Sequence, residues 1–185
     1  MTHTDLASPE RDLLLSHIRD VPDWPEPGVV FKDITPLLRD AEAFGTTVDL
    51  IAACGQDDAG VTNVDVVVGI EARGFILAAP VAERLGTGFV PIRKAGKLPH
   101  LTDSASYELE YGQATIEVHR DAFEPGDRVL LVDDVLATGG TVRATTDLVR
   151  RAGAEVVAVS VLMELGFLHG RDRLDDVVVH ALLVV

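Results

Sequence analysis

The chain has 185 residues, enough for one domain with a sizeable core, and 47% of them are hydrophobic while only 5% are aromatic, a balance typical of an α/β protein with a parallel sheet. The net charge of −14 argues against sequence-independent nucleic-acid binding, which depends on Lys and Arg neutralising phosphates. The single cysteine, Cys54, excludes an internal disulfide, and the longest apolar-rich stretch, Phe75–Ala82, is far shorter than the ~20 residues that cross a bilayer.

The first residues, Met1–Glu10, are polar and show no apolar core of a secretory signal. Together with the lone cysteine, this favours a cytoplasmic protein with no membrane partner and no nucleic-acid partner.

In the N-terminal part, Ser8 followed by a proline is typical of a helix start, and Asp40 can cap a second helix that runs to about Cys54. Three prolines within 21–28 predict an extended loop, which leads into a short apolar run at 29–31.

Strands and helices alternate through the rest of the chain. The predicted strands are 64–69, 88–92, 129–132, 155–162 and 177–184. The predicted helices are 74–85 and 141–152, with a short one near 170–174. This alternation predicts an α/β fold with a doubly wound, mainly parallel sheet flanked by helices, and with ligands at the C-terminal ends of the strands.

One segment breaks the alternation. Residues 93–106 have no hydrophobic period and are predicted to form a flexible loop. Residues 107–111 and 114–119 alternate apolar and polar, which predicts a hairpin turning at Gly112–Gln113. No internal repeat or linker divides the chain, so we expect a single domain, 1–185.

The stretch Val129–Thr141 is the most informative. A buried strand ends at Asp133 and Asp134, and an Ala-Thr-Gly-Gly-Thr loop then leads into a helix. Glycines allow a tight turn and a close approach to a ligand, and a helix start attracts anions. The two carboxylates cannot bind that anion, but they can face ribose hydroxyls, a metal ion, or both.

This order resembles the phosphoribosyl pyrophosphate (PRPP) signature of the type I phosphoribosyltransferases, whose pattern is four hydrophobic residues, two acids and a small Thr/Gly loop. Further segments resemble the adenine phosphoribosyltransferase family within that class. They are Pro27–Pro36, Gly69–Phe75, Pro91–Pro99 and Tyr107–Gly112.

The resemblance implies the type I phosphoribosyltransferase fold, with a base-binding hood segment at about 1–40 and a PRPP-binding core at about 41–185. It implies transfer of phosphoribose from PRPP to adenine, giving AMP and pyrophosphate. Mg²⁺ would be held mainly by PRPP rather than by direct protein ligands, and the family is typically a homodimer.

For the sugar phosphate, the resemblance implies a phosphate-binding loop. Its residues are Ala137, Thr138, Gly139, Gly140 and Thr141. Asp133 and Asp134 would hold the ribose hydroxyls and oppose the positive charge of the transition state.

For the pyrophosphate, the resemblance implies a loop with a cis peptide at Glu71–Ala72, next to Arg73. Arg73 is a planar donor suited to phosphate oxygens; an ordinary strand–helix turn with a surface arginine is the alternative. The cations Arg93, Lys94 and Lys97 would neutralise the leaving group, although a charge run is often only a solvated face. The chain has just three lysines, and two of them lie in this run.

For the base, the family pattern implies stacking of adenine between Phe31 and Leu165, with the Val30 backbone reading its edge and Lys32 close by. Packing in the core is the alternative for Phe31. The loop pair Glu110 and Tyr111 would cover the reaction centre, with Glu110 able to protonate or hydrogen-bond the purine; the alternative for Glu110 is a solvated hairpin residue.

Three other functions compete with adenine transfer. A transferase for hypoxanthine, guanine or xanthine would share the signature. A non-catalytic PRPP-binding regulator would be expected to carry a DNA-binding extension or a basic surface, which this chain lacks. A P-loop nucleotidase is excluded because the loop lacks the Gly-x₄-Gly-Lys spacing and its lysine.

Overall fold

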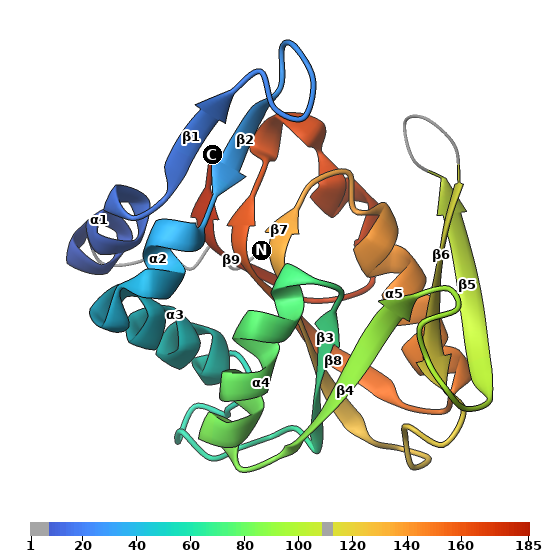
Figure 1. Ribbon diagram of the computed structural model, residues 1–185. Helices are drawn as coiled ribbons and strands as arrows, with labels where there is room; N and C mark the ends of the chain where they lie inside the picture. The colour runs from blue at the N-terminus through green and yellow to red at the C-terminus, as the bar shows by residue number, and fades with distance from the viewer. Residues whose placement is uncertain (1–7, 109–112) are drawn as a thin grey trace.

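The computed structural model describes residues 8–108 and 113–185, which form a central sheet covered by helices (Figure 1). The seven-stranded sheet has the order β5-β6-β4-β3-β7-β8-β9. Its strands are β3 (Val66–Ile70), β4 (Gly88–Lys94), β5 (Thr102–Glu108), β6 (Gln113–His119), β7 (Arg128–Leu136), β8 (Glu155–Glu164) and β9 (Val179–Val184). Strands β4, β3, β7, β8 and β9 pair in parallel, whereas β6 and β5 add an antiparallel edge. The predicted mainly parallel sheet is confirmed.

Helices cover both faces of this sheet. On one face lie α1 (Ser8–Ser16), α2 (Thr35–Arg39), α3 (Ala41–Ala53) and α4 (Arg73–Leu85), which pack against alternate residues of β3, β7 and β8. On the other face, α5 (Gly140–Arg151) packs against the intervening residues. Because both faces are buried, the central strands read as continuous apolar runs, which is why the sequence predicted them.

Two expected helix boundaries are also confirmed. Asp40 caps α3, where its carboxylate accepts a hydrogen bond from the Ala43 N–H at 2.9 Å. The short helix expected near 170–174 is present as the 3₁₀ turn η2 (Gly170–Arg173), and a further 3₁₀ turn, η1 (Gly166–Leu168), precedes it.

A small hairpin, which we call the hood hairpin (residues 19–33), stands apart from the main sheet. It pairs β1 (Arg19–Pro22) with β2 (Val30–Asp33) in antiparallel register. In Figure 1 it lies beside the ends of β7 and β8. The prediction of an unpaired loop over 21–28 is wrong at its start, since Val21 and Pro22 belong to β1. Prolines obscured the strand, yet an edge strand tolerates them.

The loop predicted at 93–106 is wrong at both of its ends. Strand β4 continues through Lys94 and β5 begins at Thr102, so only 95–101 connects them. Strand β5 is rich in Ser, Thr and Asp and shows little apolar alternation, but it pairs with β6 along its whole length. The predicted hairpin between these strands is confirmed, but its predicted turn at Gly112–Gln113 is wrong, because Gln113 already belongs to β6 and pairs with Glu108. Glu110 and Tyr111 lie outside the described residues.

Within 8–108 and 113–185, no helix combines the length and the apolar character needed to cross a membrane.

Candidate functional site

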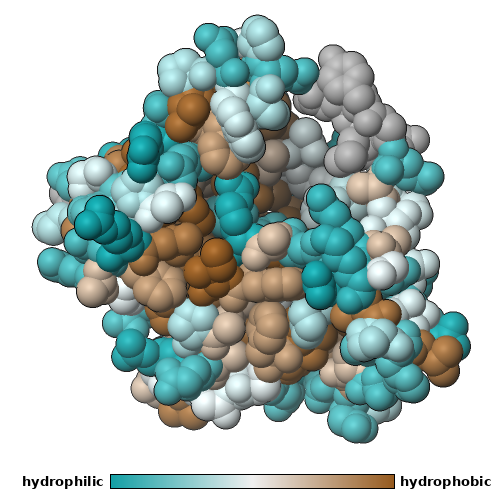
Figure 2. Space-filling model, in the orientation of Figure 1, coloured by the Kyte–Doolittle hydropathy of each residue, from teal (hydrophilic) through white to brown (hydrophobic). Residues whose placement is uncertain are grey.

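The predicted site residues follow strands β3, β4, β7 and β8, at the edge where parallel strands end together. The turn at 71–72 follows β3, Arg93 and Lys94 end β4 with Lys97 just after it, the loop at 137–139 follows β7, and Leu165 follows β8. This is the edge of an open α/β sheet where ligands bind. In the same orientation as Figure 1, the surface is hollowed beneath the hood hairpin, with hydrophilic side chains in the hollow (Figure 2).

The loop after β7 forms a small cavity of about 70 Å³. Asp133 and all of the loop residues predicted to bind phosphate line it. Gly139 has a positive φ of 80°, a conformation that glycine adopts without steric cost. Helix α5 begins at Gly140 with no side chain capping it, so its first N–H groups are free to receive an anion.

A glycine that the sequence analysis missed supports this loop from behind. Gly170, in η2, packs directly against it: a Cβ on Gly170 would lie 2.0 Å from the Ala137 carbonyl oxygen, and a Cβ on Gly139 would lie 2.3 Å from the Gly170 carbonyl oxygen. The next residue, Arg171, is anchored by the buried carboxylate of Glu164 and by the Val179 carbonyl oxygen, 2.7 Å away. A glycine inside a predicted short helix was the available signal, since it often marks a close backbone approach.

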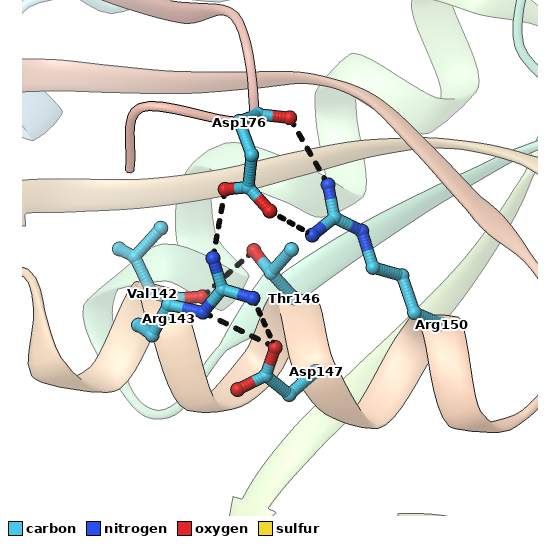
Figure 3. A network of polar contacts seen from close by, with 6 residues as sticks. All are labelled: Val142, Arg143, Thr146, Asp147, Arg150 and Asp176. Atoms are coloured by element: carbon cyan, nitrogen blue, oxygen red, sulfur yellow. Dashed lines mark hydrogen bonds and ion pairs between the residues drawn. The ribbon is translucent and has the colours of Figure 1, made fainter. Parts of the chain in front are cut away.

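Helix α5 is held in place farther along its length by a second set of charges (Figure 3). The Asp176 carboxylate accepts hydrogen bonds from Arg143, at 2.7 Å, and from Arg150. Arg143 also pairs with Asp147 one turn along the helix. These contacts fix the helix whose start forms the anion cavity.

The paired acids at the end of β7 are both buried, and they have different partners. Asp133 accepts a hydrogen bond from the Asp134 N–H at 2.9 Å, and its carboxylate lies where a Cβ on Gly74 would be only 2.7 Å away. Asp134 forms an ion pair with Arg73, with 2.8 Å between Oδ2 and Nε. Within the described residues no donor is aligned to complete a hydrogen bond to this buried Oδ2. A buried carboxylate oxygen without an aligned donor can accept a hydrogen bond from a ligand hydroxyl.

Burial shapes the ionisation of both acids. Burial raises the pKa of Asp133 well above its usual range, and the neighbouring charge of Asp134 raises it further. Burial also raises the pKa of Asp134, against the opposing effect of Arg73. Perturbed carboxyl pairs of this kind cluster at functional sites.

Arg73 connects these acids to the hood hairpin. Its guanidinium carbon lies 4.9 Å from the centroid of the Phe31 ring, close enough for a cation–π contact. Phe31 also meets Trp24 edge-on, with 4.4 Å between the ring centroids. Core packing, the alternative for Phe31, does not apply, because the ring is only partly buried and belongs to neither core cluster.

The other three residues predicted to bind the base are Val30, Lys32 and Leu165. Val30 is 50% exposed on β2. Lys32 bonds across the hood hairpin to Asp20 at 2.7 Å. The Leu165 N–H donates to the Leu136 carbonyl oxygen at 2.9 Å, which places Leu165 beside the loop after β7.

The turn after β3 has the cis peptide at Glu71–Ala72 that the resemblance implied. The side chain of Glu71 is 8% exposed and forms ion pairs with Arg93, in β4, and with Lys97, in the connection after β4. It accepts hydrogen bonds from Arg93 Nε at 3.1 Å, from the Lys94 backbone N–H at 2.9 Å, and from Lys97 Nζ. Burial opposes its ionisation, but these donors outweigh burial and lower the pKa of Glu71 to about 2.

The donor set offers little to a metal ion on its own. In the part of the chain that the structure describes, no cluster of three or more His, Cys, Asp or Glu side chains has the arrangement of a metal site.

Comparisons with known proteins identify the family of this chain. A family model described as the phosphoribosyl transferase domain matches residues 39–181. An adenine phosphoribosyltransferase of Nocardioides sp. is 60% identical over 185 residues, which is the full length of both chains. The crystal structure of adenine phosphoribosyltransferase from Rhodothermus marinus superposes with a TM-score of 0.90 at 50% identity, covering 97% of this chain and 100% of that one.

A more distant structure carries ligands. Adenine phosphoribosyltransferase of Saccharomyces cerevisiae, complexed with adenine and an imino-altritol bisphosphate, superposes with a TM-score of 0.88 at 35% identity, covering 94% of this chain and 98% of that one. Given these matches over nearly its whole length, the chain belongs to the phosphoribosyltransferase family and, within it, to the adenine phosphoribosyltransferases.

Proposed function

We propose that this protein transfers the 5-phosphoribosyl group from PRPP to adenine, giving AMP and pyrophosphate, a step of purine salvage. One observation carries the proposal most directly. Of two adjacent buried carboxylates, Asp133 lines a small cavity at the start of α5, and Asp134 has an oxygen to which no donor among the described residues is aligned. Such a site fits a sugar phosphate, whose hydroxyls and phosphate need opposite kinds of partner. The name of the 60% identical relative supports the same reaction.

The reaction breaks the bond between ribose C1 and the pyrophosphate oxygen, while adenine N9 forms a new bond to C1. The transition state at C1 carries positive charge, so the protein acts by positioning and electrostatics and needs no nucleophile of its own. The loop at 137–141 holds the 5′-phosphate. Asp133 and Asp134 accept hydrogen bonds from the ribose hydroxyls and stabilise the developing charge.

The leaving pyrophosphate meets the cations on the other side of C1. Arg93, Lys94 and Lys97 neutralise its charge, and Arg73 lies between it and the ribose acids. The backbone of 71–72 completes this part of the site. Arg73 pairs with Asp134, and substrate binding exchanges this contact for contacts with PRPP.

Adenine stacks against Phe31, with Leu165 on its other face, the Val30 backbone along its edge and Lys32 nearby. The yeast relative bound to adenine supports a base site of this kind. Glu110 and Tyr111 are proposed to close over the reacting atoms from the turn after β5.

Mg²⁺ is proposed to arrive with PRPP. Asp133 and Asp134 could contribute at most a small ligand set, which fits an ion that keeps most of its ligands from substrate phosphates and water. When bound, the ion would neutralise part of the pyrophosphate charge.

We further propose a homodimer in the cytoplasm. Apolar side chains gather on the face over α4 (Figure 2), and Ile76 of that helix is 44% exposed. The division into a hood segment at about 1–40 and a PRPP-binding core at about 41–185 belongs to the same proposal; the hood hairpin and the main sheet, two separate sheets, support it.

The ribose acids provide the test of the reaction. Asp133→Asn and Asp134→Asn should each lower turnover by orders of magnitude and leave the circular dichroism spectrum unchanged. Asp49→Asn, which removes a carboxylate from the exposed side of α3, serves as the matched control and should keep full activity. Near-normal turnover in both site variants would remove the acids from the mechanism.

A panel of bases tests the substrate. AMP formation from adenine should exceed the products from hypoxanthine, guanine and xanthine, and a tenfold preference for a 6-oxopurine would overturn the assignment. If the purified protein with Mg²⁺ did not consume PRPP with any of these bases, a PRPP-binding regulator would become the better description.

A further inference from the structure

Glu71 places a negative charge among the groups that are proposed to bind pyrophosphate. Its carboxylate bonds to Arg93, to Lys97 and to the Lys94 backbone N–H. Its side chain is 8% exposed, whereas the side chains of its partners are more open, 34% for Arg93 and 47% for Lys97, so a ligand can reach the cations. With its pKa lowered to about 2, Glu71 is ionised at every pH at which the protein would work.

The geometry leaves these cations able to bind a second anion. Glu71 engages Arg93 through Nε, and Lys97 through one of its three ammonium hydrogens. Among the described residues, the terminal guanidinium nitrogens of Arg93 and two hydrogens of Lys97 have no other partner, so they can bind a ligand. The Arg93 guanidinium carbon also lies 5.9 Å from the centroid of the Phe75 ring, in a cation–π contact. Glu71 therefore orients two cations and cancels one of their two charges.

We propose that Glu71 is an internal counter-anion that weakens the hold of this site on pyrophosphate, so that the product leaves after transfer. The inference rests on the proposed function, because it takes Arg93 and Lys97 as pyrophosphate ligands. A site that held pyrophosphate with the full charge of both cations would bind the transition state and the released product alike, and tight product binding slows turnover. A carboxylate sharing the same cations repels the product.

The test is Glu71→Gln, which keeps the shape of the side chain and removes its charge. Calorimetric titration with magnesium pyrophosphate should show at least a tenfold gain in affinity, and AMP, whose phosphate binds at 137–141, should keep its affinity within about threefold. A tighter pyrophosphate complex cannot result from a damaged fold or a loosened loop. Unchanged or weaker pyrophosphate binding would overturn the proposal.

Glu117→Gln is the matched control. Glu117 accepts a hydrogen bond from the Gly96 N–H of the same loop at 3.0 Å and forms no ion pair within the described residues. The Glu117→Gln variant should change pyrophosphate affinity by less than threefold. A gain in affinity equal to that of Glu71→Gln would show that the loss of any nearby negative charge strengthens pyrophosphate binding, and would refute a specific role for Glu71.

The outcomes separate this inference from the proposed function. Wild-type protein that makes AMP, with a Glu71→Gln variant that gains no pyrophosphate affinity, refutes only the counter-anion. Wild-type protein that binds no pyrophosphate refutes the counter-anion as well, while AMP formation judges the proposed function independently.

Discussion

The guanidinium of Arg73 lies over the ring of Phe31, and the indole of Trp24 contacts the same ring edge-on. If adenine stacks on this ring, Phe31→Ala removes a base–aromatic contact that is typically worth about 1–3 kcal/mol. The Michaelis constant for adenine should then rise roughly tenfold or more, and that for PRPP should change little. Steady-state kinetics with each substrate varied in turn measures both constants, and equal increases would contradict stacking.

Glu71 gives the protein a defined pH dependence. Its pKa is about 2 in the folded protein, against the ordinary value of 4.5, so its contribution to stability is complete above pH 4.5 and is lost as pH falls towards 2. We expect the melting temperature of Glu71→Gln to lie below that of wild type near neutral pH. Thermal melts in a pH series should show this gap shrinking below pH 4.5, and a gap that stayed constant to pH 2.5 would contradict the assignment.

Single residues also show where sequence reasoning succeeded and where it stopped. Asp133, Asp134 and the loop after them lie in one continuous motif, so local order alone was enough to predict them as a candidate site. The pairing of Arg73 with Asp134 joins residues 61 positions apart, and only the packing of α4 against β7 brings them together. Gly170 was not predicted for a similar reason: its contact with Ala137 depends on how η2 packs against the loop after β7.

At the level of elements, η2 packs against the loop that is proposed to bind the phosphate. Gly170→Ala would place a Cβ 2.0 Å from the Ala137 carbonyl oxygen, so the loop must shift. We expect the Michaelis constant for PRPP to rise at least tenfold, with a smaller change in that for adenine.

The control for this variant comes from the neighbouring 3₁₀ turn. Gly166→Ala would meet a Val184 methyl group at 3.2 Å, a contact that a small adjustment relieves. Its kinetics should stay within about twofold of wild type, so similar losses in both variants would count against a specific role for Gly170.

Elements with buried faces were predictable, and exposed or short ones were not. Strands β3, β7 and β8 are continuous apolar runs because helices cover both of their faces. Strand β5 is polar and partly exposed, and its pairing with β6 rather than its own pattern defines it. The five-residue α2 and the four-residue β1 are too short for a hydrophobic period to emerge.

For the whole molecule, charge imbalance sets the response to salt. The chain has 30 acidic and 16 basic residues, so repulsion among carboxylates opposes the compact state. Raising KCl from about 0.02 M to about 0.5 M shortens the screening distance from roughly 20 Å to about 4 Å. We expect the melting temperature to rise, at about 2–4 °C for each kcal/mol gained.

Differential scanning calorimetry at constant pH measures this response. Salt also weakens the ion pairs that hold α5, such as Arg143–Asp176, so the sign of the change reports which effect dominates. A melting temperature that falls with salt would show that the ion pairs outweigh the repulsion.

The contact between Trp24 and Phe31 has a practical consequence. Trp24 is the only tryptophan in the chain and is 51% exposed, so all of its indole fluorescence originates beside the proposed base pocket. Adding adenine should therefore alter the intensity or wavelength of this emission, whereas ribose 5-phosphate alone should alter it less. Nucleobase occupancy can thus be followed in real time in the unlabelled protein.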